Sequence, residues 1–210
     1  MPHLPTETVR SIVEAAGVEC VLFDLEDLWR GTAGCRDPDV DVLGLSTSFI
    51  CDSYTLGRTI DWLTSRFLGV PLVLGGQFSN LKFAGILKRH PAVTYIIRGD
   101  AEIALPALLQ ALDGSGTLDQ VPNLVWRDPG GGVRTNPPAS LDLDAVPAPE
   151  FQGTHRLVPY ESMRGCPFFG KYCSHPSASP RWRFRSADRI CSDWMHYAEH
   201  NGARSIRAMD

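Results

Sequence analysis

The chain has 210 residues, of which 43% are hydrophobic, and its formal net charge is −4. This length allows one good core and the beginning of a second. The acidic balance argues against non-specific nucleic-acid binding, and no apolar run approaches the roughly 18 residues of a membrane span. Because the N-terminus also lacks the basic and apolar regions of a signal peptide, we expect a cytoplasmic protein.

The first 112 residues alternate between helix-like and strand-like segments. Four segments read as helices: residues 7–16, 55–67, 81–88 and 104–112. Four short apolar runs have the length of strands: residues 18–24, 40–46, 71–74 and 93–97. Such alternation predicts an α/β domain with a doubly wound, flavodoxin-like parallel sheet, which we assign to residues 1–113.

A Pro- and Gly-rich linker is expected over residues 114–158, with a small hairpin formed by 123–127 and 133–135. A third region, residues 159–210, begins with a short strand and a cysteine-containing loop. A helix over 187–201, ended by Gly202, and a final strand over 205–209 complete it.

Small and polar residues follow three of the predicted strands. Ser46 and Thr47 follow the second strand, Gly75 and Gly76 follow the third, and the fourth leads into Arg98-Gly99-Asp100-Ala101-Glu102. In open parallel sheets, ligands sit beyond the carboxyl ends of the strands. The sequence therefore predicts a shared pocket rim, although each of these residues alone is also common turn chemistry.

The stretch from Arg164 to Cys173 resembles an iron–sulfur loop of the form C-x3-C-x2-C, in which three thiolates hold a [4Fe-4S] cluster. Cys166 and Cys173 occupy the outer positions and Gly170 the middle one. Three interpretations stay open: a labile or bridged cluster helped by His175 or a partner chain, a zinc site with His175, or a degenerate loop. The remaining cysteines are widely scattered, which favours reduced thiols.

Four arginines cluster near the end of the sequence: Arg181, Arg183, Arg185 and Arg189. Most such clusters are solvated surface, and the alternative is that they contact an anionic cofactor.

Several motifs in sequence order resemble the cobalamin-dependent radical S-adenosylmethionine (SAM) enzymes. They are Leu43-Gly44-Leu45-Ser46, Val73-Leu74-Gly75-Gly76, Ile97-Arg98-Gly99-Asp100-Ala101-Glu102, Leu124–Asp128, Leu143–Pro147 and Arg164-Gly165-Cys166-Pro167. The resemblance implies a cobalamin-binding domain followed by the start of a radical SAM barrel, with cobalamin, a [4Fe-4S] cluster and SAM as cofactors. Members of this family catalyse methyl transfer to unactivated carbon or phosphorus, or related rearrangements.

The resemblance also implies site residues and a departure. Ser46, Thr47, Gly75, Gly76, Gly99 and Glu102 would contact the corrin ring, and Cys166 and Cys173 would bind iron. The family's first, central strand has no counterpart before residue 7, and its barrel is longer than residues 159–210. We therefore expect a fragment or diverged member with impaired cluster binding, or a remnant, whose sheet or barrel a partner chain completes. The alternative is a non-catalytic corrinoid- or partner-binding module, a pseudoenzyme.

Overall fold

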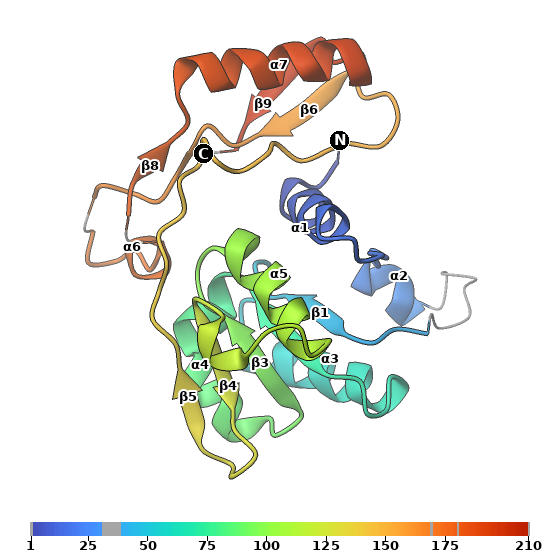
Figure 1. Cartoon of the computed structure of the whole chain (residues 1–210), viewed down its shortest axis with the longest axis vertical. Helices are drawn as coiled ribbons and strands as arrows, with labels where there is room; N and C mark the ends of the chain where they lie inside the picture. Colours follow the sequence, from blue (N-terminus) through green and yellow to red (C-terminus); the bar gives the residue numbers. More distant parts are fainter. Residues whose placement is uncertain (1, 31–38, 169, 180, 210) are drawn as a thin grey trace. The chain divides into compact units, whose positions relative to one another are not determined.

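The structure is a computed structural model that describes residues 2–30, 39–168, 170–179 and 181–209, without the side chains of residues 27–29 and 176. The chain divides into two compact units. One is formed by residues 23–139, and the other by residues 1–22 together with 140–210. Figure 1 shows their helices and strands. Among the described residues, no helix combines the length and the apolar character needed to cross a membrane.

The unit of residues 23–139 contains a five-stranded sheet with the strand order β1-β2-β3-β4-β5. The first three strands are parallel, and the last two continue the sheet in antiparallel fashion. Its elements are α2 (Leu25–Arg30), β1 (Leu43–Ser46), α3 (Ser53–Arg66), β2 (Leu72–Gly75), α4 (Gln77–Arg89), β3 (Val93–Ile97), α5 (Ala101–Leu112), the 3-10 helix η1 (Leu118–Gln120), β4 (Leu124–Arg127) and β5 (Val133–Thr135).

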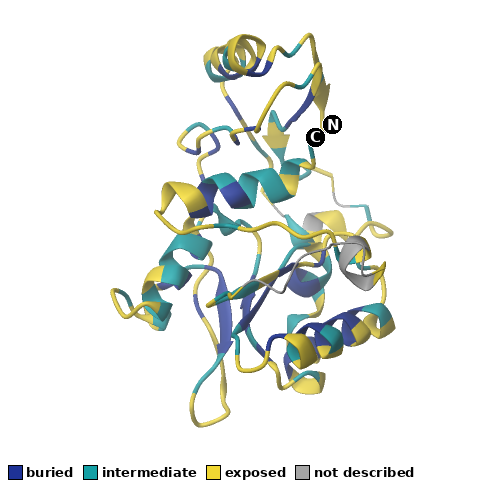
Figure 2. Cartoon of the chain, turned by 90° about the vertical axis from the view of Figure 1, so that its right-hand side faces the viewer, coloured by how far each residue is buried: buried dark blue, intermediate teal, exposed yellow. Residues whose placement is uncertain are grey.

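Helices cover both faces of this sheet. Leu56 of α3 and Leu87 of α4 share one buried cluster with alternate residues of the strands. Ala104 and Leu108 of α5 share a second cluster with the intervening strand residues, because successive side chains of a strand point to opposite faces. Figure 2 shows the buried positions concentrated in these strands. The predicted fold class, an α/β domain wound on both faces of a parallel-rich sheet, is confirmed.

The predicted strand over residues 18–24 is wrong. These residues adopt no regular structure, and Val18, Val21, Leu22 and Phe23 are all exposed. An apolar run becomes a strand only when a neighbouring strand supplies hydrogen-bond partners. Among the described strands, none pairs with residues 18–24, and β1 is left at the edge of the sheet.

The predicted hairpin is confirmed, and it extends the sheet. Trp126 of β4 lies opposite Tyr95 of β3, and β4 then pairs with β5. The backbone N–H of Asp128 donates to the carbonyl of Gly132 at 2.9 Å, which closes the turn at the expected place. The parallel part of the sheet is thus followed at once by an antiparallel edge.

The second unit has two short ladders and one long helix. β6 pairs with β9 in parallel, and β7 pairs with β8 in antiparallel fashion. The helix α7 begins at the N-cap Ser186 and ends at Gly202, whose left-handed φ of 66° stops it as predicted. The elements are α1 (Leu4–Ala15), β6 (Leu157–Tyr160), β7 (Met163–Arg164), α6 (His175–Ala178), β8 (Arg183–Phe184), α7 (Ala187–Asn201) and β9 (Ser205–Ala208).

The N-terminal helix α1 is part of this second unit. Arg10 donates from Nη2 to the carbonyl of Glu150 at 2.9 Å, and the Ser11 hydroxyl accepts the N–H of Glu150 at 2.9 Å. Two polar contacts therefore fix the helix to a segment about 140 residues further along the chain.

Candidate functional site

The carboxyl ends of the three parallel strands meet at one edge of the sheet. Ser46, the last residue of β1, lies directly opposite Gly75, the last residue of β2. Gly99 follows the end of β3, which runs parallel to β2. The three residues therefore share the edge at which α/β sheets bind their ligands.

Thr47 is buried at this edge, and its hydroxyl is occupied within the protein. Thr47 Oγ1 donates to the carbonyl of Gly75 at 2.7 Å and accepts the backbone N–H of Ser79 at 3.0 Å. The backbone N–H of Thr47 also donates to the Gly75 carbonyl at 2.8 Å. Thr47 thus ties the end of β1 to the start of α4 and holds the shape of the rim.

Gly76 brings two segments of this edge into close approach. A Cβ at this position would lie 2.8 Å from both the backbone nitrogen and the hydroxyl oxygen of Ser48. Its φ is +96°, a region that side-chain-bearing residues seldom adopt. Gly76 is therefore required by the backbone that connects β2 to α4.

Gly75 and Gly99 leave the rim open. No atom outside their immediate chain neighbours lies within 4 Å of the place where a Cβ would stand on either residue. Ser46 is exposed, and Glu102 is half-buried in the first turn of α5. A flat ligand can approach backbone at the two glycines and find a hydroxyl and a carboxyl group at the same edge.

Asn123 supports the end of the third parallel strand, and our reading of the sequence did not select it. Its side-chain nitrogen donates to the carbonyl of Asp100 at 3.0 Å, and its Oδ1 accepts the N–H of Ala139 at 2.9 Å. Asn123 also has a positive φ of 62°, a conformation in which asparagine is favoured. The only local indication of its role in the sequence was its position between Pro122 and the apolar run 124–126.

The cysteine loop lies between β7 and β8 in the sequence, and these two short strands pair with each other. Gly165, with φ +90°, lies so close to the other side of the loop that a Cβ would be 2.0 Å from the carbonyl oxygen of Arg181. Cys166 is half-buried and Cys173 is exposed. The N–H of Cys173 donates to the Gly170 carbonyl at 3.0 Å, so a tight turn precedes the second cysteine.

Two thiolates do not fit a complete [4Fe-4S] cluster. In the described part of the chain, no three side chains of His, Cys, Asp or Glu are arranged to hold a metal ion. At Gly170 the backbone is not left-handed, and a Cβ would meet first the ring of Tyr172 at 3.2 Å. Since Tyr172 is 98% exposed, its ring can turn aside for a third ligand side chain, which the sequence does not supply.

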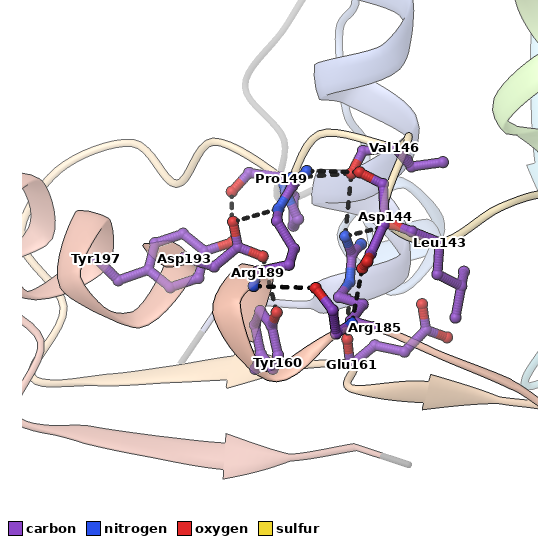
Figure 3. Close-up of polar contacts among 11 residues, drawn as sticks. Leu143, Asp144, Val146, Pro149, Tyr160, Glu161, Arg185, Arg189, Asp193 and Tyr197 are labelled. Carbon is purple, nitrogen blue, oxygen red and sulfur yellow. Dashed lines mark hydrogen bonds and ion pairs between the residues drawn. The ribbon is translucent and has the colours of Figure 1, made fainter. Parts of the chain in front are cut away.

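The arginine cluster contains one buried and one half-buried anchor, so neither predicted role holds for Arg185 and Arg189. Arg185, only 6% exposed, donates from Nη1 to the carbonyls of Leu143 and Val146 at 2.7 and 3.0 Å. Arg189 donates from Nη2 to Val146 at 2.9 Å and from Nε to Asp193 at 2.8 Å. Figure 3 shows both guanidinium groups directed at this segment. Their hydrogen bonds go to backbone carbonyl groups and, from Arg189, to the carboxylate of Asp193.

Two buried tyrosines extend the same network (Figure 3). Tyr160 donates its hydroxyl to Asp193 Oδ2 at 2.7 Å, and Tyr197 donates to the carbonyl of Pro149 at 3.0 Å. Burial, followed by the hydrogen bond to Asp193, raises the pKa of Tyr160 well above its usual range. Burial likewise raises the pKa of Tyr197. Both phenols therefore act as fixed neutral donors.

No protein-family model matches the chain, but comparison with curated proteins finds relatives. The anaerobic magnesium-protoporphyrin IX monomethyl ester cyclase of Synechocystis is 27% identical over 187 residues, covering 83% of this chain and 37% of that protein. An uncharacterized methyltransferase of Pyrococcus horikoshii is 26% identical over 192 residues, covering 83% of this chain and 40% of that protein. The chain thus spans less than half the length of these relatives.

Solved structures show the same resemblance. The cobalamin-dependent SAM radical enzyme OxsB, with aqua-cobalamin and SAM bound, matches with a TM-score of 0.72 and 18% identity over 97% of this chain and 31% of OxsB. The radical SAM methyltransferase TsrM of Kitasatospora setae, with cobalamin and a [4Fe-4S] cluster bound, matches with a TM-score of 0.69 and 19% identity over 100% of this chain and 45% of TsrM. The resemblance to cobalamin-dependent radical SAM enzymes that the sequence indicates is confirmed, and the fold is shared.

Proposed function

We propose that the chain is a cobalamin-binding protein of the radical SAM, methyltransferase-like type, and that the carboxyl edge of its sheet receives the corrin ring. The observation that carries this proposal is the open rim at Gly75 and Gly99, where no atom occupies the place of a side chain. OxsB and TsrM, which share the fold, are described with cobalamin bound. Bound cobalamin supplies a carrier for a methyl group.

Each residue of the rim has a distinct part in this proposal. Gly75 and Gly99 give the flat ring access to backbone, while the exposed hydroxyl of Ser46 and the carboxyl group of Glu102 offer polar contacts at its margin. Thr47 and Gly76 act indirectly, because the hydroxyl of Thr47 and the close approach at Gly76 fix the backbone of the rim.

Filling the open edge tests the cobalamin site. Gly75→Val places a branched side chain where the ring would lie, and we expect it to weaken hydroxocobalamin binding at least about tenfold. Gly85→Val is the matched control, because Gly85 is equally free of neighbours but lies on the exposed side of α4. Binding is followed by the visible spectrum of the corrinoid, and folding by circular dichroism. Equal affinities of the two variants would refute the site.

We propose further that the cysteine loop alone does not assemble a complete cluster, so that this chain does not cleave SAM reductively by itself. Two thiolates, Cys166 and Cys173, leave one of the three usual iron ligands missing, and Gly170 has no side chain to replace it. The nearest atoms to a Cβ at position 170 belong to the exposed ring of Tyr172, which can turn aside, so the missing ligand is restorable.

Restoring that ligand is the test. Wild type, Gly170→Cys and the control Gly170→Ala are reconstituted anaerobically, and iron content and 5′-deoxyadenosine are measured. We expect only Gly170→Cys to approach four irons per chain, the content of a [4Fe-4S] cluster. A wild type that reaches four irons and turns over SAM as well as the variant would overturn the proposal, because another group must then complete the cluster.

A second candidate function is a non-catalytic corrinoid- or partner-binding module. Gly170, in the place of the central cluster cysteine, favours it. The relatives are more than twice as long as the region matched here, so the reaction and substrate of the whole enzymes stay proposals. If cobalamin binds and Gly170→Cys gains a cluster without making 5′-deoxyadenosine, the module is the better description.

A further inference from the structure

Two histidines lie one helical turn apart on an accessible face of α7. His196 and His200 are four residues apart, and positions i and i+4 of an α-helix lie one above the other. Their rings stack, with centroids 4.2 Å apart and 25° between the planes. The helix alone therefore brings two imidazoles together.

The hydrogen bonds of the two rings fix which nitrogen carries the proton. His200 Nδ1 lies 3.0 Å from the carbonyl oxygen of His196, and since a carbonyl only accepts, Nδ1 is the donor. His196 Nε2 lies 3.2 Å from Oε2 of Glu150, and an ionised carboxylate likewise accepts. In the neutral form each ring keeps one lone pair free, on Nε2 of His200 and on Nδ1 of His196.

This pattern is the one in which imidazoles bind metals. A histidine that binds a metal through one nitrogen almost always donates its other N–H to a carbonyl or a carboxylate, which orients the ring. His200 has the first kind of partner and His196 the second. Two histidines four residues apart on one helix are also a recurrent metal-binding spacing, and imidazole suits zinc, copper and nickel.

The surface around the pair leaves room for an ion and its water. An open depression of about 480 Å³ is lined by this face of α7, including Ser192 one turn before His196. No third His, Cys, Asp or Glu within the described ranges completes a ready-made set of ligands with the pair. Water, or one of the side chains Asp188, Cys191 and Glu199 that also line the depression, would fill the remaining positions, which distinguishes such a site from a closed structural one with four protein ligands.

We propose that His196 and His200 form a surface site for a divalent transition metal of the nickel, copper and zinc class. The lone pairs lie in the ring planes, which differ by only 25° in the stack, so the rings turn until both free nitrogens face the ion. Glu150 acts as a positioning residue that orients His196. The site uses none of the residues assigned above to cobalamin or iron, so it stands or falls independently of the proposed function.

Calorimetric titration of the untagged full chain with NiCl2 tests this site. We expect one Ni²⁺ to bind, with affinity reduced at least about tenfold by His196→Ala or by His200→Ala, and about tenfold by Glu150→Gln, the usual cost of losing an orienting partner. His175→Ala, outside the pair, is the matched control and should bind as wild type does. Circular dichroism checks that each variant is folded.

Two further variants keep the outcome decisive. Ser192→His adds a third imidazole on the same face of α7 and should tighten binding. A Cys166→Ser, Cys173→Ser double variant should bind Ni²⁺ as wild type does. The proposal is overturned if wild type binds no Ni²⁺, if both alanine variants bind unchanged, or if binding disappears in the double variant, because the ion would then belong to the thiolates.

Discussion

Replacing Gly165 by alanine probes how closely the two sides of the cysteine loop approach. A Cβ would lie 2.0 Å from the carbonyl oxygen and 2.6 Å from the carbonyl carbon of Arg181, and neither backbone atom can swing aside like the end of a side chain. An alanine held at a φ of +90° destabilises the folded state by about 1–2 kcal/mol, and overpacking typically destabilises it by about a further 1–3 kcal/mol. We therefore expect Gly165→Ala to lower the free energy of unfolding by about 2–5 kcal/mol, or else to open the β7–β8 ladder locally.

Two matched glycines separate the contributions. Gly153 has φ +78° but no neighbour within 4 Å of a Cβ. Gly153→Ala should therefore lower the free energy of unfolding only by the cost of the backbone conformation, about 1–2 kcal/mol. Gly170 is not left-handed, and its nearest neighbour is the exposed ring of Tyr172. Gly170→Ala should therefore stay within about 0.5 kcal/mol of wild type.

Urea denaturation followed by far-ultraviolet circular dichroism and tryptophan fluorescence measures the three variants. Hydrogen exchange over residues 163–184 detects local opening that the global transition would miss. If Gly165→Ala matches Gly153→Ala within about 0.5 kcal/mol and exchange over the loop is unchanged, the close approach at Gly165 does not exist and the reasoning fails.

Other substitutions and conditions test the rim and the buried network. Arg185→Met should lower the free energy of unfolding in urea by about 2–4 kcal/mol, because buried carbonyl groups lose a charged donor. The exposed Arg181→Met should change it by no more than about 0.5 kcal/mol, and equal losses would contradict the anchoring role. Gly76→Ala should lower the unfolding midpoint and Gly75→Ala should not, since only Gly76 faces backbone at 2.8 Å; coincident midpoints would count against the close approach. Burial raises the pKa of Tyr160, so the unfolded chain releases this proton first, and stability should fall as the pH rises above about 10; a Tyr160→Phe variant with the same alkaline slope would argue otherwise.

Local patterns were sufficient to predict most helices and strands of the sheet unit. The segment 71–74 is apolar, has strand length and runs directly into two glycines, and it forms β2 almost as expected. The segment 18–24 has the same local character but forms no strand. The difference lies in the neighbours, because a strand depends on partners that the segment itself does not encode.

The rim was predictable in position but not in the role of each residue. Gly75 and Ser46 lie at the predicted edge because parallel strands end together. The sequence shows that Thr47 has a hydroxyl group but not whether this group faces a ligand or, as in the structure, Ser79. For Arg185 the sequence likewise shows only a positive charge. Its burial could not be predicted, because the carbonyl groups that accept its hydrogen bonds lie about 40 residues away along the chain.

The split of one unit between the two ends of the sequence has a consequence for biosynthesis. α1 leaves the ribosome before the sheet unit, yet its partner Glu150 follows 140 residues later, a delay of roughly 7–30 s at ordinary rates of elongation. An isolated helix of 12 residues is only marginally stable in water. Meanwhile all five strands of the sheet become available. Folding during translation should therefore begin in the sheet unit, and the docking of α1 should follow it.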